Sequence, residues 1–372
     1  MKLNPEAISK IPSPTAKGER ARVRGRVFSC NRSPLTPALS PLSRGEGVFL
    51  RSLLFELILA ASAVMVALPV AAQNYPDRPI RLVVPFPPGG GSDITGRTIA
   101  LKLGEALGQQ IIVDNRGGAG GNIGTDIVAK AVPDGYTIVM ALSGPFSING
   151  SLLGKLPFDP VKDFALITLA GATPNLLVAH PAVAVQSVKD LIGLAKASPG
   201  KINFASSGLG TPAQLAGELF NTMAGVKLVH VPYKGAAPAL TDLLAGQVQL
   251  MFSTMPPALP QVKAGKLKAI AVTSAKRSIA TPELPTIAES GLPGFEAITW
   301  YGMAAPAGTP QPIIKKLNAE VVKLLHLPEV RERLLATGTE ASGTSPEAFA
   351  AYIKSEIVKW AKVIKESGAK AE

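Results

Sequence analysis

Short apolar runs alternate with longer amphipathic segments from residue 81 onward. In the first series, strands are predicted at residues 81–84, 111–114, 136–141 and 165–170, and helices at residues 94–107 and 123–131. This strand–helix–strand order is typical of a mostly parallel sheet with helices on both faces. The first part of the chain therefore predicts an α/β lobe.

A second series has the same order. Strands are predicted at residues 176–179, 202–205, 228–231, 249–252, 267–272 and 298–304, and helices at residues 188–196, 212–224, 236–244, 312–325 and 346–367. No third sheet follows residue 304, so the last helices must pack on the existing lobes. We expect two doubly wound α/β lobes with a ligand cleft between them. Residues 73–172 are expected to form the first part of lobe 1 and residues 173–299 to form lobe 2. Residues 300–372 are expected to return to lobe 1.

The first 72 residues differ from the rest of the chain. Residues 48–72 combine Arg51, an apolar run at 57–68 and small residues before Gln73, which is the pattern of a signal peptide cleaved after Ala72. An uncleaved membrane anchor is the alternative, and Glu56 is unusual in a signal. Residues 1–47 precede this segment, so we interpret them as a non-native extension from a wrong start site.

Charge and cysteine content narrow the classes of function. The chain has 38 basic and 26 acidic residues, and removal of residues 1–72 leaves 28 and 22, a net charge of +6. These charges are scattered, with few aromatic residues between them, which argues against nucleic-acid binding. The single cysteine, Cys30, lies in the removed segment. An exported chain without cysteine is consistent with the bacterial periplasm.

A glycine-rich loop follows the first predicted strand in "VVPFPPGGGSD", residues 83–93. It lacks the lysine of a phosphate-binding P-loop and the GxGxxG of a dinucleotide loop. Glycines still allow a ligand close to the backbone, and a helix N-terminus attracts an anion. A structural turn with Ser92 or Asp93 as the helix N-cap is the alternative. The carboxylate of Asp93 would repel an anionic ligand. Asp93 must therefore cap the helix, orient a water molecule or accept a hydrogen bond from a donor group on the ligand.

A second loop of the same design lies in "NFASSGLGTPAQLAGELF", residues 203–220, with Thr211 as the expected N-cap and Pro212 at the first helical position. Gly208 to Ala213 match GxGxxA, but the next strand ends without the acidic residue that would hold a ribose. Two helix N-termini, one in each lobe, suit a carboxylate ligand. For the third cluster, residues 116–122, we favour a tight strand-to-helix turn.

Catalytic and metal-binding patterns are sparse. His180, His230 and His326 lie at no metal-ligand spacing, so no metal, cofactor or catalytic residue is predicted. Ser206 and Ser207 lack the upstream glycine of a GxSxG nucleophile turn. A secreted serine hydrolase using Ser206 or Ser207 remains the rival hypothesis. It requires a general base near these hydroxyls, and the local sequence offers none.

Several motifs together carry a family resemblance: "VVPFPPGGGSD", "NRGGAGGNIG", "SSGLGT", "VPYKGAAPALTDLLAGQV" and "WYGMAAPAGTP". Residues 75–368 resemble the periplasmic receptors of tripartite tricarboxylate transporters, the Bug receptors. The resemblance implies a type II periplasmic-binding-protein fold that closes on a small organic carboxylate. It also implies a monomer that passes its ligand to one large and one small membrane permease subunit, or an orphan receptor without a permease.

The same resemblance implies the ligand-binding residues. They are Phe86, Gly89, Gly90, Ser92 and Asp93 in the first loop, Ser206, Ser207, Gly208 and Thr211 in the second, and Ser143 at the end of a strand. One position departs from the pattern, because Gln214 stands where many relatives carry histidine. Glutamine cannot become a cation, so the ligand preference of those relatives does not transfer to this chain.

Overall fold

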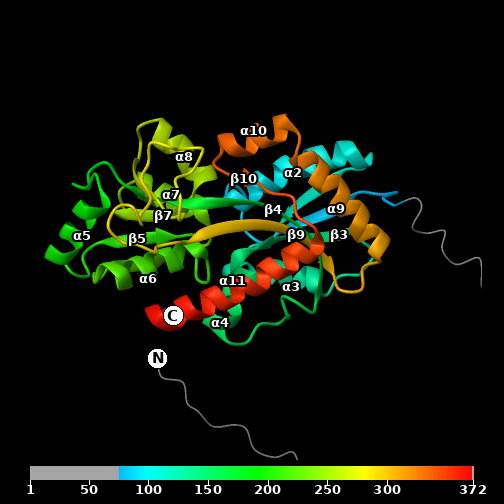
Figure 1. Ribbon diagram of the computed structural model, residues 1–372, viewed down its shortest axis with the longest axis horizontal. Helices are drawn as coiled ribbons and strands as arrows, with labels where there is room; N and C mark the ends of the chain where they lie inside the picture. Colours follow the sequence, from blue (N-terminus) through cyan, green and yellow to red (C-terminus); the bar gives the residue numbers. More distant parts are fainter. Residues whose placement is uncertain (1–74, 371–372) are drawn as a thin grey trace, which may run out of the picture. The chain divides into compact units, whose positions relative to one another are not determined.

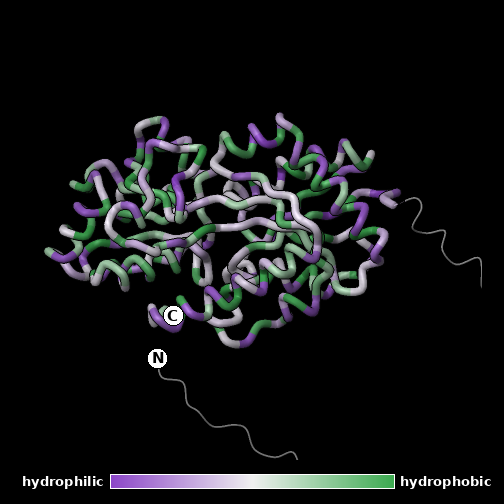
Figure 2. The backbone as a smooth tube through the Cα atoms, in the orientation of Figure 1, coloured by the Kyte–Doolittle hydropathy of each residue, from purple (hydrophilic) through white to green (hydrophobic). Residues whose placement is uncertain are grey.

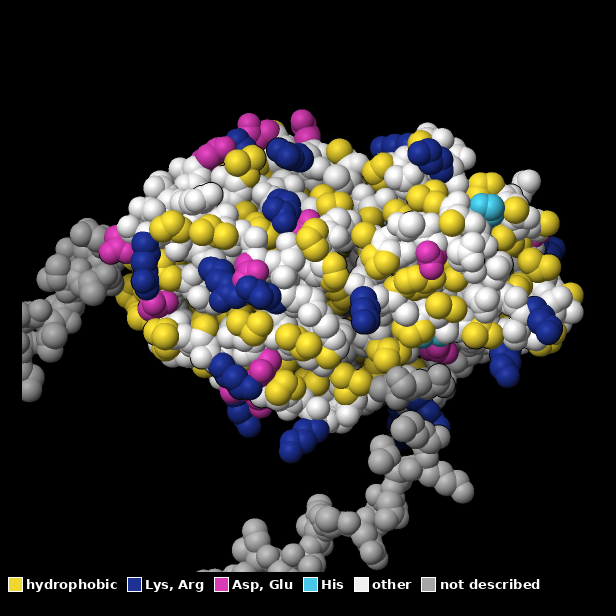
Figure 3. Space-filling view, turned by 180° about the vertical axis from the view of Figure 1, so that it is seen from behind, with side chains coloured by type: hydrophobic (Ala, Val, Ile, Leu, Met, Phe, Trp, Pro, Cys, Tyr) yellow, Lys and Arg dark blue, Asp and Glu magenta, His cyan; other side chains and the backbone are white. Residues whose placement is uncertain are grey.

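The computed structural model describes residues 75–370. The predicted extension, residues 1–47, and the predicted signal peptide, residues 48–72, lie outside the described residues. None of the helices in the described part is both long and apolar enough to cross a membrane. On the face shown in Figure 3, Lys and Arg side chains are spread among Asp and Glu side chains without forming a stripe of one sign.

Three parallel strands form the edge of the first lobe. β1 (Ile80–Val84) lies between β2 (Ile111–Asn115) and β3 (Thr137–Leu142). Helices α2 (Gly91–Leu107) and α3 (Asn122–Ala129) connect these strands. Leu82 packs into one hydrophobic core and Val83 into another, so both faces of the sheet are covered. Both predicted helices and all three strands are present, displaced at their ends by one to three residues.

The second lobe is built around three further parallel strands. β5 (Asn203–Ser206) lies between β6 (Val229–Pro232) and β7 (Leu250–Thr254). The remaining elements of this lobe are α5 (Val188–Ala197), α6 (Pro212–Ala224), α7 (Ala236–Leu244), α8 (Met255–Lys263) and β8 (Lys268–Val272). Helix α8 was not predicted, because three of its nine residues are proline. Two of these prolines lie in its first turn, where no intrahelical amide is lost.

Two strands run through both lobes, as Figure 1 shows for β4 (Phe164–Ala179) and β9 (Ile298–Pro306). The first part of β4 pairs with β9, and its last five residues pair with β7 and β8, all antiparallel. The expectation of a mostly parallel sheet is therefore wrong at the centre. Residues 165–170 and 176–179 are one strand, because pairing with β9 continues through Gly171 and Pro174. The predicted lobe boundaries at 172 and 299 fall inside these two strands.

Helices complete the first lobe and connect it to the second. They are η1 (Ala119–Gly121), η2 (Gly144–Ile148), α4 (Asn149–Leu153), α9 (Gln311–Leu325), α10 (Pro328–Ala336) and α11 (Pro346–Ser367), with the short strand β10 (Glu340–Ala341) beside β4. Hydrophilic and hydrophobic residues alternate along the outer helices in Figure 2. On α11, Phe349 packs in a core of the first lobe, whereas Trp360 and Ile364 pack in the core of the second. Helix α11 therefore bridges the two lobes.

Candidate ligand-binding site

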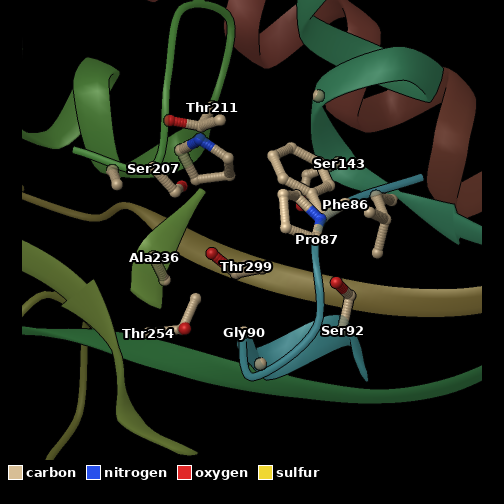
Figure 4. A pocket seen from close by; sticks show the side chains of 15 residues that line it. Phe86, Pro87, Gly90, Ser92, Ser143, Ser207, Thr211, Ala236, Thr254 and Thr299 are labelled. Carbon is tan, nitrogen blue, oxygen red and sulfur yellow. The ribbon is translucent and has the colours of Figure 1, made fainter. Parts of the chain in front are cut away.

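A pocket lies where several helices of both lobes begin. Its lining residues are Phe86, Pro87, Gly90, Gly91, Ser92, Leu142, Ser143, Gly144, Ser207, Thr211, Pro212, Ala213, Ala236, Thr254 and Thr299. Figure 4 shows Ser207 and Thr211 on a loop of the second lobe opposite Phe86 and Pro87 of the first. The space open to the centres of water molecules is about 50 Å³.

Most of the pocket surface is apolar, and the polar groups in its lining are uncharged. Six lining residues carry a hydroxyl group: Ser92, Ser143, Ser207, Thr211, Thr254 and Thr299. None of the lining side chains is ionisable. Four helices of at least nine residues, α2, α6, α7 and α8, have their N-caps or first residues in the lining. Their first amides have no acceptor within the helix, and the helix dipoles favour an anion at this position.

The first loop places Gly90 and Ser92 in the pocket lining and Asp93 behind it. The N-cap of α2 is Gly90, with no side-chain bond, so the expectation that Ser92 or Asp93 caps the helix is wrong. Asp93 instead accepts hydrogen bonds from the amide of Gly89 and from Asn115 and Arg97, each at 3.0 Å. Gly89 and Asp93 do not line the pocket.

The charge of Asp93 is compensated within the first lobe. Burial alone would raise the pKa of its carboxyl group, but the hydrogen bonds from Arg97, Gly89 and Asn115 outweigh burial and lower the pKa. The ionised carboxylate therefore stabilises the loop through hydrogen bonds outside the pocket lining. Of the three roles considered for Asp93, this geometry supports a structural one close to helix capping.

The second loop ends in the predicted helix cap. The hydroxyl of Thr211 accepts a hydrogen bond from the amide of Gln214 at 3.3 Å and donates one to the carbonyl of Gly208 at 2.7 Å. Pro212 occupies the first helical position, as predicted. Ser207 and Thr211 line the pocket, whereas Ser206 and Gly208 lie outside its lining.

Ser206 contacts a histidine that the sequence did not connect with it. The Oγ atom of Ser206 lies 2.7 Å from Nε2 of His230 and accepts a hydrogen bond from the Gly208 amide at 3.1 Å. The local sequence offers no base, but the fold brings His230 to Ser206. Parallel pairing of β5 with β6 brings together two residues that are 24 positions apart. His230 also stacks on Phe204, and burial lowers its pKa to about 4, so its imidazole is neutral at pH 7.

Ser143 lies at the end of β3 and lines the pocket, as expected from the sequence. Its hydroxyl accepts a hydrogen bond from the amide of Trp300 at 3.0 Å, which fixes β3 to β9. Trp300 and Tyr301 are fully buried in the core. One hydroxyl in the lining therefore also holds the first lobe to a strand that crosses into the second.

Five lining residues from the second lobe and the crossing strand were not predicted as site residues: Pro212, Ala213, Ala236, Thr254 and Thr299. Ala236 follows the N-cap of α7, Thr254 is the N-cap of α8, and Thr299 lies on β9. The signal at Ala236 was the preceding Gly235, which resembles the glycines of the other two loops. Thr254 was hidden by the prolines that follow it. Thr299 gave no local signal, because its position depends on how β9 passes between the lobes.

Backbones of the two lobes approach each other around the pocket. A Cβ atom at Gly144 would lie 2.7 Å from the carbonyl oxygen of Gly210, and one at Gly120 would overlap the carbonyl oxygen of Leu209. Gly235 of the second lobe similarly faces Pro87 of the first. The third glycine cluster is thus a tight turn, as predicted, and also a point of contact between the lobes. The structure is closed over the pocket.

This fold and this pocket define the class of the protein: it is a two-lobed α/β protein with the fold of the periplasmic solute-binding proteins. Residues 95–369 match the family model described as "Tripartite tricarboxylate transporter family receptor". The chain therefore belongs to this family, whose members are solute-binding receptors and include the Bug proteins.

Three solved structures are similar to most of the chain. Rpa4515 of R. palustris with adipate is 40% identical, with a TM-score of 0.78 over 79% of this chain and 98% of its own. The periplasmic binding protein BugD is 39% identical, with a TM-score of 0.77 over 80% of this chain and all of its own. MatC of Rhodopseudomonas palustris with bound malate is 34% identical, with a TM-score of 0.74 over 78% of this chain and all of its own.

Proposed function

We propose that this protein is a periplasmic receptor that captures a small organic carboxylate in the pocket lined by Ser92, Ser143, Ser207 and Thr211. It would deliver this ligand to the large and small permease subunits of a tripartite tricarboxylate-type membrane transporter, or act as an orphan receptor. The observation that carries the proposal is the convergence of helix N-termini and hydroxyl groups on a pocket without an ionisable side chain. Such a site stabilises an anion through dipoles and hydrogen bonds.

Two further observations support a small acid as the ligand. The pocket is small, with about 50 Å³ open to the centres of water molecules, which favours a short acid over a large cofactor. Two similar proteins were solved with adipate and with malate, both of which are short dicarboxylates. Gly90 carries no side chain at the start of α2, and a Cβ atom there would meet nothing closer than 3.9 Å, so a carboxylate can approach the backbone closely at this residue.

A thermal-shift screen over organic acids tests the proposal. Adipate, malate, citrate, glutamate and benzoate are compared with the corresponding amides, which keep the shape and lose the charge. An acid at 100 times its Kd should stabilise the protein by about 2.7 kcal/mol. For a protein of this size that corresponds to a rise in Tm of roughly 5–10 °C, at about 2–4 °C per kcal/mol. Equal stabilisation by amides would contradict a carboxylate site, and a neutral ligand would then be the better interpretation.

The contact between Ser206 and His230 is the one observation that favours the rival hydrolase. Its geometry argues against a nucleophile, because Ser206 is fully buried and lies outside the pocket lining. No hydrogen bond to an acidic side chain orients the imidazole of His230 among the described residues. Hydrolysis of ester or amide substrates that disappears in a Ser206→Ala variant would overturn the receptor proposal.

A further inference from the structure

We propose that Gln214 is a positioning residue for ligand capture, which sets the shape of the second loop through a hydrogen bond to the amide of Gly210. The inference rests on the proposed function, because this loop forms one wall of the pocket. Gln214 is only 2% exposed and does not line the pocket itself. Any effect of Gln214 on a ligand must therefore pass through the loop.

Both ends of the Gln214 amide group have partners. Its Oε1 atom accepts a hydrogen bond from the Gly210 amide at 2.8 Å, and its Nε2 atom makes a longer contact of 3.5 Å to the carbonyl oxygen of Lys370. Thr211 and Gln214 have the spacing of a capping box, in which the helix cap and the third helical residue satisfy each other's backbone amides. Here the glutamine takes the amide one residue before the cap. The Gly210 amide is thereby bound within the protein and is not a donor for the ligand.

Gly210 is the point where the loop meets the first lobe. It is buried, with a φ of +70°, and its carbonyl oxygen faces Gly144 across the gap between the lobes. Its α-carbon lies against the side chain of Asn149, also of the first lobe. A shift of Gly210 would therefore change the contact between the lobes and move the lining residues Ser207 and Thr211.

Loss of the glutamine oxygen would leave the Gly210 amide buried without a partner. A buried donor without an acceptor is less favourable than an exposed one, so the loop would move until the amide found water or another acceptor. The closed form of the pocket would then be less populated, and a ligand that binds this form would bind more weakly. The expected loss of affinity is about tenfold, the size typical of one buried hydrogen bond.

A second glutamine provides a matched control. Oε1 of Gln249 accepts a hydrogen bond from the amide of Asn203 at 3.0 Å. Asn203 begins β5, whereas Ser206, at the start of the second loop, ends it. Gln249 thus makes the same kind of bond to a backbone amide, but at the start of β5, whereas the Gly210 amide lies in the loop that follows this strand. A purely structural role predicts the same consequences for both glutamines.

The experiment compares Gln214→Met with Gln249→Met. Methionine keeps the side-chain length and removes the amide oxygen. Both variants should lower the Tm, Gln214→Met more because its bond to the Gly210 amide is buried whereas the bond of Gln249 is part-buried. Only Gln214→Met should weaken binding of adipate or malate by about tenfold, measured by calorimetry. In the empty protein, only Gln214→Met should accelerate hydrogen exchange of the Gly210 amide, measured by NMR. Gln214→Glu keeps an acceptor oxygen and should retain slow exchange at Gly210.

Wild-type affinity in Gln214→Met, or an equal loss of affinity in Gln249→Met, would overturn the positioning role. Unchanged exchange of the Gly210 amide in Gln214→Met would also overturn it. If neither acid binds the wild-type protein, it is the proposed ligand class that fails. Exchange of the Gly210 amide in the empty protein still decides whether Gln214 holds the loop.

Discussion

Gly144→Ala adds one methyl group at a close approach between the lobes. Its Cβ atom would lie 2.7 Å from the carbonyl oxygen of Gly210, whereas an ordinary contact begins near 3.4 Å. The closed arrangement must therefore relax by about 0.7 Å. Both sides are backbone, so no side chain can rotate away. The residue does not have a positive φ, so alanine adds no backbone strain of its own.

The expected result is a loss of affinity without a loss of stability. A methyl group at a helical glycine stabilises the fold by up to about 1 kcal/mol, whereas a hindered closure reduces the fraction of binding-competent protein. If the Kd rises tenfold, an acid at 100 times the wild-type Kd is at only 10 times the variant's Kd. Stabilisation by that acid then falls from about 2.7 to about 1.4 kcal/mol. Thermal shift and calorimetry with adipate and malate measure both quantities.

Gly193→Ala is the control for this experiment. Gly193 lies inside α5, and a Cβ atom there would meet nothing within 4 Å. This variant should gain stability from helix propensity and keep the wild-type affinity. Wild-type binding by Gly144→Ala would refute the reasoning, because it would mean that the lobes need not approach this closely around a ligand.

Three other predictions follow from the sequence and the structure. Material purified from the periplasm should begin at Gln73, and N-terminal sequencing that finds residues before Val48 would contradict both the signal peptide and the wrong start site. The pKa of His230 falls from 6.5 in the unfolded chain to about 4 in the folded protein, so between these pH values the unfolded chain binds a proton that the folded protein does not. The free energy of unfolding should therefore drop by up to about 3 kcal/mol as the pH is lowered from 6.5 to 4. Denaturant melts should show a smaller drop in a His230→Gln variant. Asp93→Asn should cost about 1–2 kcal/mol at pH 7 through the weakened bonds to Gly89 and Arg97. The difference from wild type should narrow progressively as the pH falls from 3.8 through the lower pKa of the folded protein, because protonation of Asp93 removes this stabilisation over that range.

The sequence predicts elements well where local signals agree. Helix α6 has the predicted bounds because Thr211 and Pro212 define its start and Gly225 its end. Helix α8 was missed because propensity counts its prolines against a helix, although those in the first turn lose no hydrogen bond. The unbroken β4 could not be predicted, because Gly171 and Pro174 interrupt the local pattern and only pairing with β9 carries the strand through them.

Pocket residues were also easier to predict from local signals than from pairing between distant strands. Phe86, Gly90, Ser92, Ser143, Ser207 and Thr211 were expected from motifs near strand ends, and all of them line it. Gly89, Asp93, Ser206 and Gly208 belong to the same loops but do not line it, because a loop motif does not indicate which way each residue points. Thr299 and the partner of Ser206 depend on pairing between distant strands. Such neighbours follow from the register of the sheet and not from local sequence.

The bridge formed by α11 has a consequence for the order of folding. Trp360 and Ile364 lie in the core of the second lobe, although most of that lobe is encoded more than 60 residues earlier. Loss of a buried tryptophan from a core typically costs 3–5 kcal/mol, a large share of the stability of a domain. A nascent chain that ends before residue 360 therefore lacks part of both lobes. The second lobe therefore reaches full stability only after α11 has been synthesised, and this delay would suit the export that the predicted signal peptide implies.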